Sequence, residues 1–224
     1  SLSERFAGKQ GNGPIDIAVI RFPRISNFTD LAALECREEV SLRYISQSAD
    51  FGEPDLVILP GTKNTIADLL WMRQNGLEGK ILRHASAGGL VFGICGGYQM
   101  LGAEVHDPDG VEAGAGKCVR GMELLPARTV FEPEKHRTQI TGHFGIVQGA
   151  FAELTDVPFA GYEIHMGETI RDGGQPFSWI QYENGENIAA MAMDSDARSG
   201  YKTDSNPNGA PAGGKEDGCI SGNV

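Results

Sequence analysis

The sequence predicts an α/β fold with a largely parallel sheet, because apolar runs of strand length alternate with segments of helical spacing. Four such runs lie in the first half of the chain, at residues 15–22, 40–46, 55–60 and 90–94. Continuous apolar runs of this length are typical of strands that are buried on both faces. The first of them, "IDIAVIRF", is the clearest example.

Helical segments fill the spaces between these predicted strands. Residues 23–35 are expected to contain a short helix, with Thr29 as a plausible N-cap. A helical period over residues 64–76 ends at Gly76, and residues 77–89 continue as a second helix that closes with glycines. The order of elements is therefore strand, helix, strand, strand, two helices and strand.

The second half of the chain has a different pattern. Residues 117–193 read as short strands and turns, which predicts a mixed or antiparallel extension of the sheet. A mobile loop is expected at about residues 197–216, where Asp, Ser, Asn, Gly and Pro predominate. Residues 1–14 are polar and Gly-rich and are expected to be a linker or a disordered N-terminus. One domain is predicted over residues 15–224.

The composition narrows the classes of partner and location. The chain has 19 Lys and Arg against 30 Asp and Glu, a formal net charge of −11, which disfavours nucleic acid and anionic membranes as partners. No apolar run approaches the ~18–20 residues that cross a bilayer, and no signal peptide is evident, so a cytoplasmic protein is expected. Cys36, Cys95, Cys118 and Cys219 form no C-x-x-C pair, so no metal site is predicted.

Two glycine-rich turns stand where the predicted strands end. "LPGTKN" follows the third strand, and its Pro60-Gly61 pair is a stop signal. "GICGG" follows the fourth strand, at residues 93–97. Because ligands of open α/β sheets bind beyond the carboxyl ends of the strands, both turns are candidates for a functional site.

Cys95 lies in the stretch "GLVFGICGGYQMLG", which fits the nucleophile-elbow pattern G-x-Nuc-x-G with Cys as nucleophile. The elbow is a strained turn, and Gly93 and Gly97 provide the space that it needs. A helix that begins near Gly96 would point its N–H groups at the sulfur and lower the pKa of the thiol. A buried structural cysteine at a strand end is the other reading, and the turn alone leaves both open.

The motif "GICGGYQMLG" resembles the nucleophile motif of class I glutamine amidotransferases, in the branch of cobyric acid synthase and cobyrinic acid a,c-diamide synthase. Further stretches resemble the cobyric acid synthases in the family's order: residues 17–35, 55–77, 107–112 ("DPDGVE") and 161–169 ("GYEIHMGET"). The resemblance covers most of residues 15–170. It implies a class I amidotransferase fold, a flavodoxin-like parallel sheet flanked by helices.

The resemblance also implies a function. Members of this branch join an N-terminal ATP-dependent synthetase domain, which activates carboxylates of a corrin ring, to a C-terminal domain that hydrolyses glutamine. This chain resembles the C-terminal domain, and it contains no G-x-x-x-x-G-K-[ST] loop. We therefore expect no cofactor in this domain, with ATP and Mg²⁺ belonging to the synthetase domain. The expected partners are glutamine, that synthetase domain and its corrin substrate.

The mechanism that the resemblance implies can be written on these residues. The Cys95 thiolate attacks the side-chain amide of glutamine and forms a glutamyl thioester. Backbone N–H groups of Gly96 and Gly61 hold the oxyanion, and a histidine protonates the leaving ammonia. Gln99, one turn into the helix after the elbow, is a candidate for contacting bound glutamine. A solvated or intrahelical polar role for Gln99 is the alternative.

The catalytic histidine is the point at which the sequence departs from the family. The resemblance implies a late G-T-Y-L-H-G motif after a segment like "DGCISGNV", and the sequence ends at Val224 without it, so a C-terminal truncation is expected. His165 in "YEIHMG" is a substitute, although a structural or substrate-side role is favoured for it. Weaker candidates are His84, His106, His136 and His143.

Two alternative functions stay open. One is another Cys–His amidotransferase of the same fold, which would act on cobyrinic acid or on a cell-wall lipid precursor. The other is a catalytically silent module that only docks to a synthetase, which the missing late histidine suggests. The stretches "PRISNFTD" and "YEIHMG" favour the cobyric acid synthase reading over other enzymes.

Overall fold

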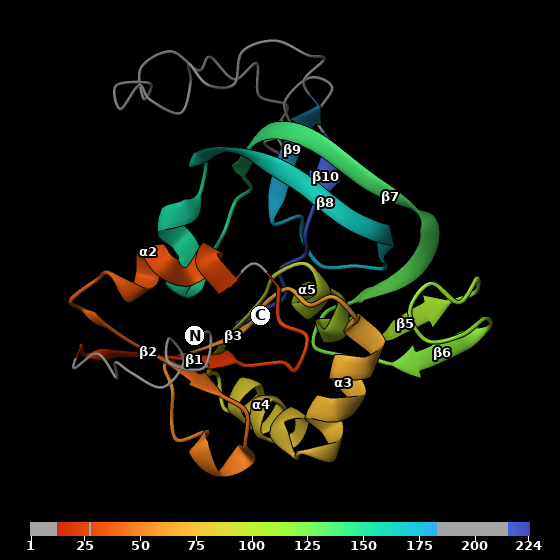
Figure 1. Cartoon of the computed structure of the whole chain (residues 1–224). Helices are drawn as coiled ribbons and strands as arrows, with labels where there is room; N and C mark the ends of the chain where they lie inside the picture. Colours follow the sequence, from red (N-terminus) through yellow and green to blue (C-terminus); the bar gives the residue numbers. More distant parts are fainter. Residues whose placement is uncertain (1–12, 27, 183–214) are drawn as a thin grey trace. The chain divides into compact units, whose positions relative to one another are not determined.

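The computed structural model describes residues 13–26, 28–182 and 215–224 (Figure 1). The chain divides into two compact units within the range that the sequence predicted to be one domain. The first unit consists of residues 1–133, 168–173 and 223–224, and the second of residues 134–167 and 174–222. None of the helices in the described part is both long and apolar enough to span a bilayer.

The first unit is built on a parallel sheet of four strands, which confirms the predicted α/β fold. The strands run in the order β2-β1-β3-β4, and all neighbours are parallel. Their bounds are β1 (Ile15–Ile20), β2 (Val40–Ile45), β3 (Leu56–Leu59) and β4 (Leu90–Gly93). Each strand lies within a predicted apolar run, and the central strands β1 and β3 are almost wholly buried because both faces of the sheet are covered.

Helices cover both faces of this sheet. The crossover from β1 to β2 runs in one direction along the sheet and that from β3 to β4 in the other, so right-handed connections place their helices on opposite faces. Figure 1 shows α2 and α4 on opposite sides of the strands. The helices are α2 (Ala32–Glu35), α3 (Thr65–Gln74), α4 (Leu77–Ser86) and α5 (Gly96–Leu101), and short 3₁₀ turns occur at Phe28–Leu31 and Ser48–Asp50.

The starts of helices α3 and α2 differ in how they are capped. Asn64 caps α3, because its side-chain oxygen accepts a hydrogen bond from the Ala67 N–H at 2.7 Å. The predicted cap at Thr29 is wrong: Thr29 lies within the 3₁₀ turn, and α2 begins after Leu31, which makes no side-chain cap. The 3₁₀ turn continues directly into α2, so no separate cap is needed at that point.

The core of the first unit follows the two-residue period of β1. Ile17 and Val19 point to the face that carries α2 and pack in a cluster with Leu31, Leu42 and Ile58. The intervening side chains point to the opposite face, where the buried residues of the long helices lie. Those buried helix residues are Ile66, Leu69 and Met72 of α3, with Leu77 and Ile81 of α4.

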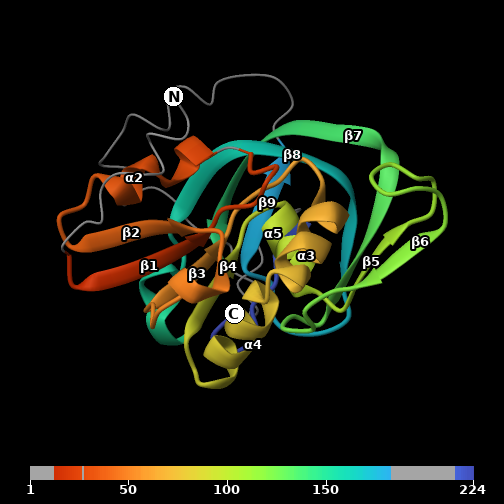
Figure 2. The ribbon, with the colours of Figure 1, turned by 60° about the horizontal axis from the view of Figure 1, so that its bottom comes forward.

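A hairpin extends the first unit beyond the parallel sheet. Strands β5 (Glu104–Asp107) and β6 (Lys117–Arg120) pair antiparallel, and β5 pairs in parallel with the start of β7 (Ala127–Phe144). Figure 2 shows β5 and β6 side by side after α5. This mixture of parallel and antiparallel pairs confirms the predicted mixed extension.

The second unit is an antiparallel arrangement of long strands. The end of β7 pairs with β9 (Ser178–Tyr182), which pairs with β10 (Lys215–Asp217), while β8 (Pro158–Arg171) pairs with β7. A 3₁₀ turn, η3 (Gly149–Leu154), precedes β8. The rings of Phe159 and Phe177 each lie 5.1 Å from that of Phe144, and these three half-buried rings form an aromatic cluster in this unit.

The lengths of β7 and β8, 18 and 14 residues, differ from the short strands that the sequence predicted. Strand β7 continues without a break through residues 132–136, between two of the stretches that the sequence suggested. It approaches β9 closely at Gly142, where a Cβ would lie 2.3 Å from the carbonyl oxygen of Trp179. Most of the expected loop at 197–216 lies outside the described residues, as do residues 1–12, but Lys215 and Glu216 belong to β10.

The close approach of β9 to β7 predicts that Gly142→Ala destabilises the protein. The added methyl group meets backbone rather than a flexible side chain, so overpacking of about 1–3 kcal/mol is expected. Gly161→Ala on β8 is the matched control, because a Cβ there has nothing within 4 Å. Chemical denaturation of the two variants measures the difference, and equal stabilities would contradict the packing described here.

Candidate active site

The turn at Cys95 is a strained elbow between β4 and α5. Cys95 has φ 52° and ψ −114°, a backbone conformation that L-residues rarely adopt. A Cβ at Gly97 would lie 2.0 Å from the carbonyl oxygen of Leu59, and one at Gly93 would lie 2.6 Å from the Cα of Tyr98. Both flanking glycines are therefore required, which is the steric reason for the G-x-C-x-G pattern.

The thiol of Cys95 is exposed, yet its electrostatic surroundings do not favour the thiolate. Burial among the protein atoms around it raises the pKa, the Gly96 N–H lowers it, and the nearby Glu112 carboxylate raises it further. The net pKa lies above the ordinary value, so the lowered pKa that the sequence predicted is wrong for the free domain.

The turn after β3 lies directly beside the elbow. A Cβ at Gly61 would lie 3.6 Å from the Cβ of Cys95. The Gly61 carbonyl accepts a hydrogen bond from the Ser26 N–H at 2.9 Å, and the Lys63 N–H donates to the carbonyl of Arg24 at 3.0 Å. These two bonds tie the segment after β3 to the segment after β1, so both strand ends line the site.

The backbone nitrogen of Thr62 lies beside the elbow. Thr62 and Ile25 form an antiparallel bridge. The hydrogen bonds of this bridge are made by the residues on either side of the pair, so the Thr62 N–H points away from Ile25. A Cβ at Gly96 would lie 3.4 Å from the Thr62 nitrogen. In the described part of the chain this N–H has no acceptor. The sequence predicted Gly61 as the second oxyanion donor. That role stays a prediction, and Thr62 is another candidate for it.

A buried carboxylate keeps these two segments together. Asp68 of α3 is fully buried, and it accepts hydrogen bonds from the Arg24 N–H at 3.2 Å, from Arg24 Nη1 at 2.7 Å and from Thr62 Oγ1 at 2.5 Å. Because one carboxylate holds both segments, Asp68 sets the position of the Thr62 backbone relative to α3. The sequence did not indicate this role, because Arg24 is 44 residues away from Asp68 along the chain.

Gln99 lies on the inner side of α5 rather than in solvent. Its side chain is buried, and its Oε1 accepts a hydrogen bond from the Thr65 hydroxyl at 3.1 Å. Thr65 is the first residue of α3, so this bond joins the helix after the elbow to the helix after the Gly61 turn. The solvated reading of Gln99 is therefore wrong, and contact with glutamine stays a prediction.

Glu112 is a site residue that sequence analysis missed. One carboxylate oxygen accepts from the Ile66 N–H at 3.0 Å, and its backbone carbonyl accepts from Asn64 Nδ2 at 3.0 Å. Burial raises the pKa of Glu112, hydrogen bonds from Ile66 and Thr65 lower it, and the Asp107 charge raises it, with a net rise. The carboxylate is close enough to Cys95 to raise the pKa of that thiol too.

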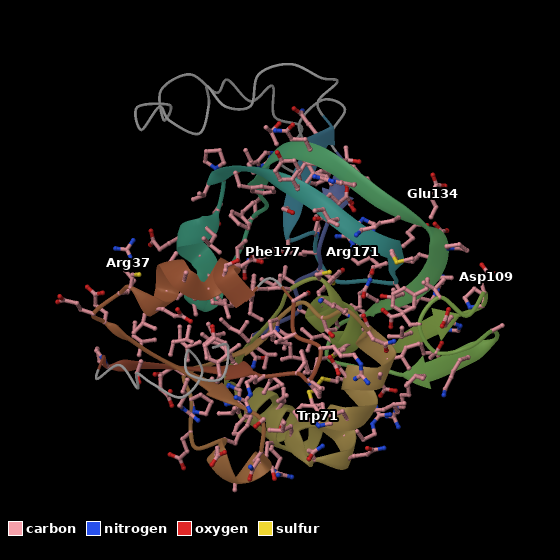
Figure 3. All side chains as sticks on the ribbon, viewed as in Figure 1. Arg37, Trp71, Asp109, Glu134, Arg171 and Phe177 are labelled. Atoms are coloured by element: carbon pink, nitrogen blue, oxygen red, sulfur yellow. The ribbon has the colours of Figure 1, made fainter. Side chains whose placement is uncertain are left out.

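Asp107 shapes the loop that brings Glu112 to the site. Its fully buried carboxylate accepts from the N–H groups of Val111 at 2.6 Å, Glu112 at 2.9 Å and Ala113 at 2.7 Å. Burial by itself raises the pKa of Asp107, but the backbone N–H groups together outweigh it and hold the pKa below its usual value. Figure 3 shows Asp109 at the outer end of this loop.

The histidines of the first unit are bonded away from the elbow. His84 Nε2 pairs with the carbonyl of Leu90, at the opposite end of β4 from Cys95, at 3.0 Å. His106 Nε2 lies 2.7 Å from a carboxylate oxygen of Glu104. Within the described part of this unit, no histidine is hydrogen-bonded to the nucleophile.

The second unit contains the other candidate histidines. Both ring nitrogens of His165 are hydrogen-bonded, Nδ1 to the Gly167 carbonyl and Nε2 to Glu163 Oε1, each at 2.8 Å. His143 is buried, and its Nε2 has no partner among the described residues. The side chain of His136 lies outside the described residues. A role for His165 in the reaction stays a prediction.

The fold and the elbow define the class of this protein. Two solved structures overlay on most of the chain: "Structure of PurLQS from Thermotoga maritima" and "Crystal structure of glutamine amidotransferase". The first has a TM-score of 0.50 and 16% identity and covers 77% of this chain and 76% of its own. The second has a TM-score of 0.50 and 13% identity and covers 74% and 84%. The chain therefore has a class I glutamine amidotransferase fold.

Sequence comparison then identifies the family. Residues 16–207 match the CobB/CobQ-like glutamine amidotransferase domain, and the chain belongs to that family. Cobyric acid synthase of Ruminiclostridium cellulolyticum is 56% identical over 174 residues, which are 78% of this chain and 34% of the relative. Cobyric acid synthase of Lachnoclostridium phytofermentans is 54% identical over 169 residues, 75% of this chain and 32% of the relative. The chain spans about a third of the length of these relatives.

The position of Glu112 predicts the pH dependence of Cys95 reactivity. In the free protein the pKa of the thiol is raised, so its alkylation should accelerate only as the pH rises above the usual cysteine value of about 8.5. Glu112→Gln removes a negative charge that opposes the thiolate, so the pKa should fall and alkylation at pH 7 should become faster. Iodoacetamide labelling across a pH series, with site-resolved mass spectrometry, measures both profiles.

The control for this titration is Glu53→Gln, which removes an exposed carboxylate whose charge does not act on the Cys95 thiol. Its labelling profile should match that of the unmodified chain. If Glu112→Gln also leaves the profile unchanged, the carboxylate does not act on the thiol as described.

Proposed function

We propose that this chain is a glutaminase: it hydrolyses the side-chain amide of glutamine through a thioester on Cys95. The observation that carries the proposal is the strained elbow, which holds an exposed thiol beside the backbone N–H groups of Gly96 and Thr62. An accessible thiol and adjacent N–H donors are the parts that acyl transfer by a cysteine requires. Membership of the amidotransferase family supports the same reaction.

The reaction can be followed atom by atom. The Cys95 sulfur, as thiolate, attacks the carbonyl carbon of the glutamine side chain, and the carbonyl oxygen becomes an oxyanion. The N–H groups of Gly96 and Thr62 donate to that oxygen, with Gly61 as the alternative second donor. The C–N bond then breaks, the nitrogen takes up a proton, and ammonia leaves the thioester. Water attacks the thioester, which releases glutamate and regenerates the thiol.

Glu112 and Gln99 form the proposed glutamine-binding side of the site. The carboxylate of Glu112 is partly desolvated and close to the thiol, so a cation next to it would be stabilised. The α-ammonium group of glutamine supplies that cation. The Gln99 side chain is held by a hydrogen bond from Thr65, so it provides an amide in a fixed position near the starts of α3 and α5. Recognition of the ammonium group and activation of the nucleophile are thereby linked.

This link explains how a thiol with a raised pKa can act as a nucleophile. In the free domain the Glu112 charge disfavours the thiolate. When the ammonium group of glutamine pairs with Glu112, the local negative charge is neutralised and the pKa of Cys95 falls. The thiol is then ionised chiefly when substrate is bound, which limits side reactions of an exposed cysteine.

The proton that leaves with ammonia requires a general acid, and we assign this role to a histidine. His84 and His106 of the first unit are bonded elsewhere. The family resemblance places the catalytic histidine in a G-T-Y-L-H-G motif that the given sequence does not contain, and His165 is the substitute within the sequence. General acid–base catalysis typically accelerates a reaction about 10²–10⁴-fold. This histidine should therefore affect the rate of glutamine turnover more than the rate at which Cys95 attacks the amide.

The ammonia is proposed to serve ATP-dependent amidation of corrin carboxylates on a synthetase domain. The support is the identity of 54–56% to proteins named cobyric acid synthase, of which this chain matches about a third. ATP and Mg²⁺ would bind to the synthetase domain. The proposed setting is the cytoplasm, where these substrates and a reduced thiol would be found together.

The nucleophile assignment predicts selective trapping of Cys95 by a diazo-ketone analogue of glutamine. The analogue places an electrophilic carbon where the amide carbonyl would lie, so one adduct per chain is expected, at Cys95. Cys36→Ser should label normally, because Cys36 is exposed but lies outside the elbow, whereas Cys95→Ser should not label. Mass spectrometry after proteolysis locates the adduct. An adduct mainly at Cys36, Cys118 or Cys219 would disprove the assignment.

Glu112→Gln should weaken the same trapping reaction. Loss of one charge-assisted hydrogen bond costs about 1.5–3 kcal/mol, so the analogue concentration for half-maximal labelling should rise roughly 10–100-fold. Iodoacetamide labelling of the same variant should instead become faster at neutral pH. A binding role thus predicts opposite changes with the two reagents, while a merely structural role predicts slower or unchanged reaction with both. An analogue that lacks the α-amino group should follow iodoacetamide and label the variant no more weakly than the parent chain.

A further inference from the structure

The β5–β6 hairpin of the first unit carries a cluster of potential metal ligands outside the nucleophile site. His106 of β5 lies directly opposite Cys118 of β6 in the antiparallel register. Glu104 precedes His106 by two residues on the same strand, so its side chain lies on the same face of the hairpin. All three side chains are accessible: Glu104 and Cys118 are exposed, and the His106 side chain is 37% exposed.

The nitrogen and the sulfur of this cluster have the spacing of a tetrahedral site, and the Glu104 oxygen, now hydrogen-bonded to the same nitrogen, would have to move away by about 0.7 Å to complete it. One nitrogen, His106 Nε2, lies 2.7 Å from a Glu104 carboxylate oxygen and 3.6 Å from the Cys118 sulfur. The three ligand atoms all lie within 4.8 Å of one another. Zinc binds sulfur at about 2.3 Å and imidazole nitrogen at about 2.0–2.1 Å, so a tetrahedral angle separates these two ligands by about 3.6 Å. The nitrogen and sulfur are thus already at the required distance.

We propose that Glu104, His106 and Cys118 bind one Zn²⁺ ion on the face of this hairpin, with solvent as the fourth ligand. Thiolate, imidazole and carboxylate together are a ligand set that zinc accepts. Binding forms a Zn–S bond and releases the thiol proton of Cys118 to solvent. His106 and Cys118 are 12 residues apart and lie opposite each other on neighbouring strands. The spacing of the cysteines along the sequence therefore did not indicate a metal site.

The position of the cluster gives the ion a structural task. Its ligands lie on both strands at the base of the loop that follows Asp107 and contains Glu112. Asp107 already holds this loop through the hydrogen bonds that it accepts from the loop backbone. A metal ion that bridges β5 and β6 would add a second link across the base of the loop. The zinc site is separate from the elbow, so it does not depend on the proposed glutaminase activity.

The first test is metal-dependent protection of individual thiols in the full chain. Chelator-treated protein is labelled with iodoacetamide with and without one equivalent of Zn²⁺, and each cysteine is quantified by mass spectrometry. Labelling of Cys118 should fall at least tenfold with zinc, while Cys36, which is also exposed, should label equally under both conditions. Equal labelling of Cys118 with and without zinc would overturn the proposal.

The second test uses Co²⁺ as a spectroscopic substitute for zinc. One equivalent should produce a thiolate-to-cobalt charge-transfer band in the near ultraviolet, and size-exclusion chromatography should show no increase in molecular mass. Cys118→Ser and His106→Ala should lose the band, whereas Cys36→Ser and Cys95→Ser should keep it. Circular dichroism of the variants checks that they are folded. A band that survives Cys118→Ser, disappears in Cys95→Ser or saturates at half an equivalent would exclude this single-chain site.

Discussion

The close approach of α5 to the carboxyl ends of β3 and β4 is the constraint on which the site depends. With Gly97 packed against the Leu59 carbonyl, the chain turns sharply enough to hold Cys95 at positive φ. Such strain persists only where the surrounding structure determines the backbone completely. The parallel sheet supplies that determination, because β3 is almost wholly buried and β4 is paired with it along its whole length.

The second feature of the site is its distribution of charge. Asp107 and Asp68 are fully buried carboxylates, and each accepts several hydrogen bonds, so both act as connectors between segments of backbone. Glu112 differs from them because its carboxylate, which accepts from the Ile66 N–H at the start of α3, has a raised pKa and acts on the thiol. Two carboxylates thus fix the geometry, and the third is the one for which we propose a role in binding a cationic substrate group.

This arrangement changes the expected chemistry of the cysteine. A helix N-terminus alone would favour the thiolate, but α5 is only six residues long and its Gly96 N–H is opposed by burial and by Glu112. The resulting thiol is less reactive in the free domain than the elbow motif suggests. A nucleophile that is activated by its substrate fits an exposed position better than one that is always ionised.

The sequence by itself determined the parallel sheet and the position of the elbow, because both are local patterns. Apolar runs marked β1 to β4 within a few residues, and the glycines beside Cys95 marked the strained turn. Tertiary structure alone decided the raised thiol pKa and placed the Thr62 backbone and the Glu112 carboxylate beside the elbow. Each arises from residues that are far apart along the chain and are brought together by strand order and by the loop around Asp107. The lengths of β7 and β8 were also decided there, because they depend on pairing between strands that are distant along the chain.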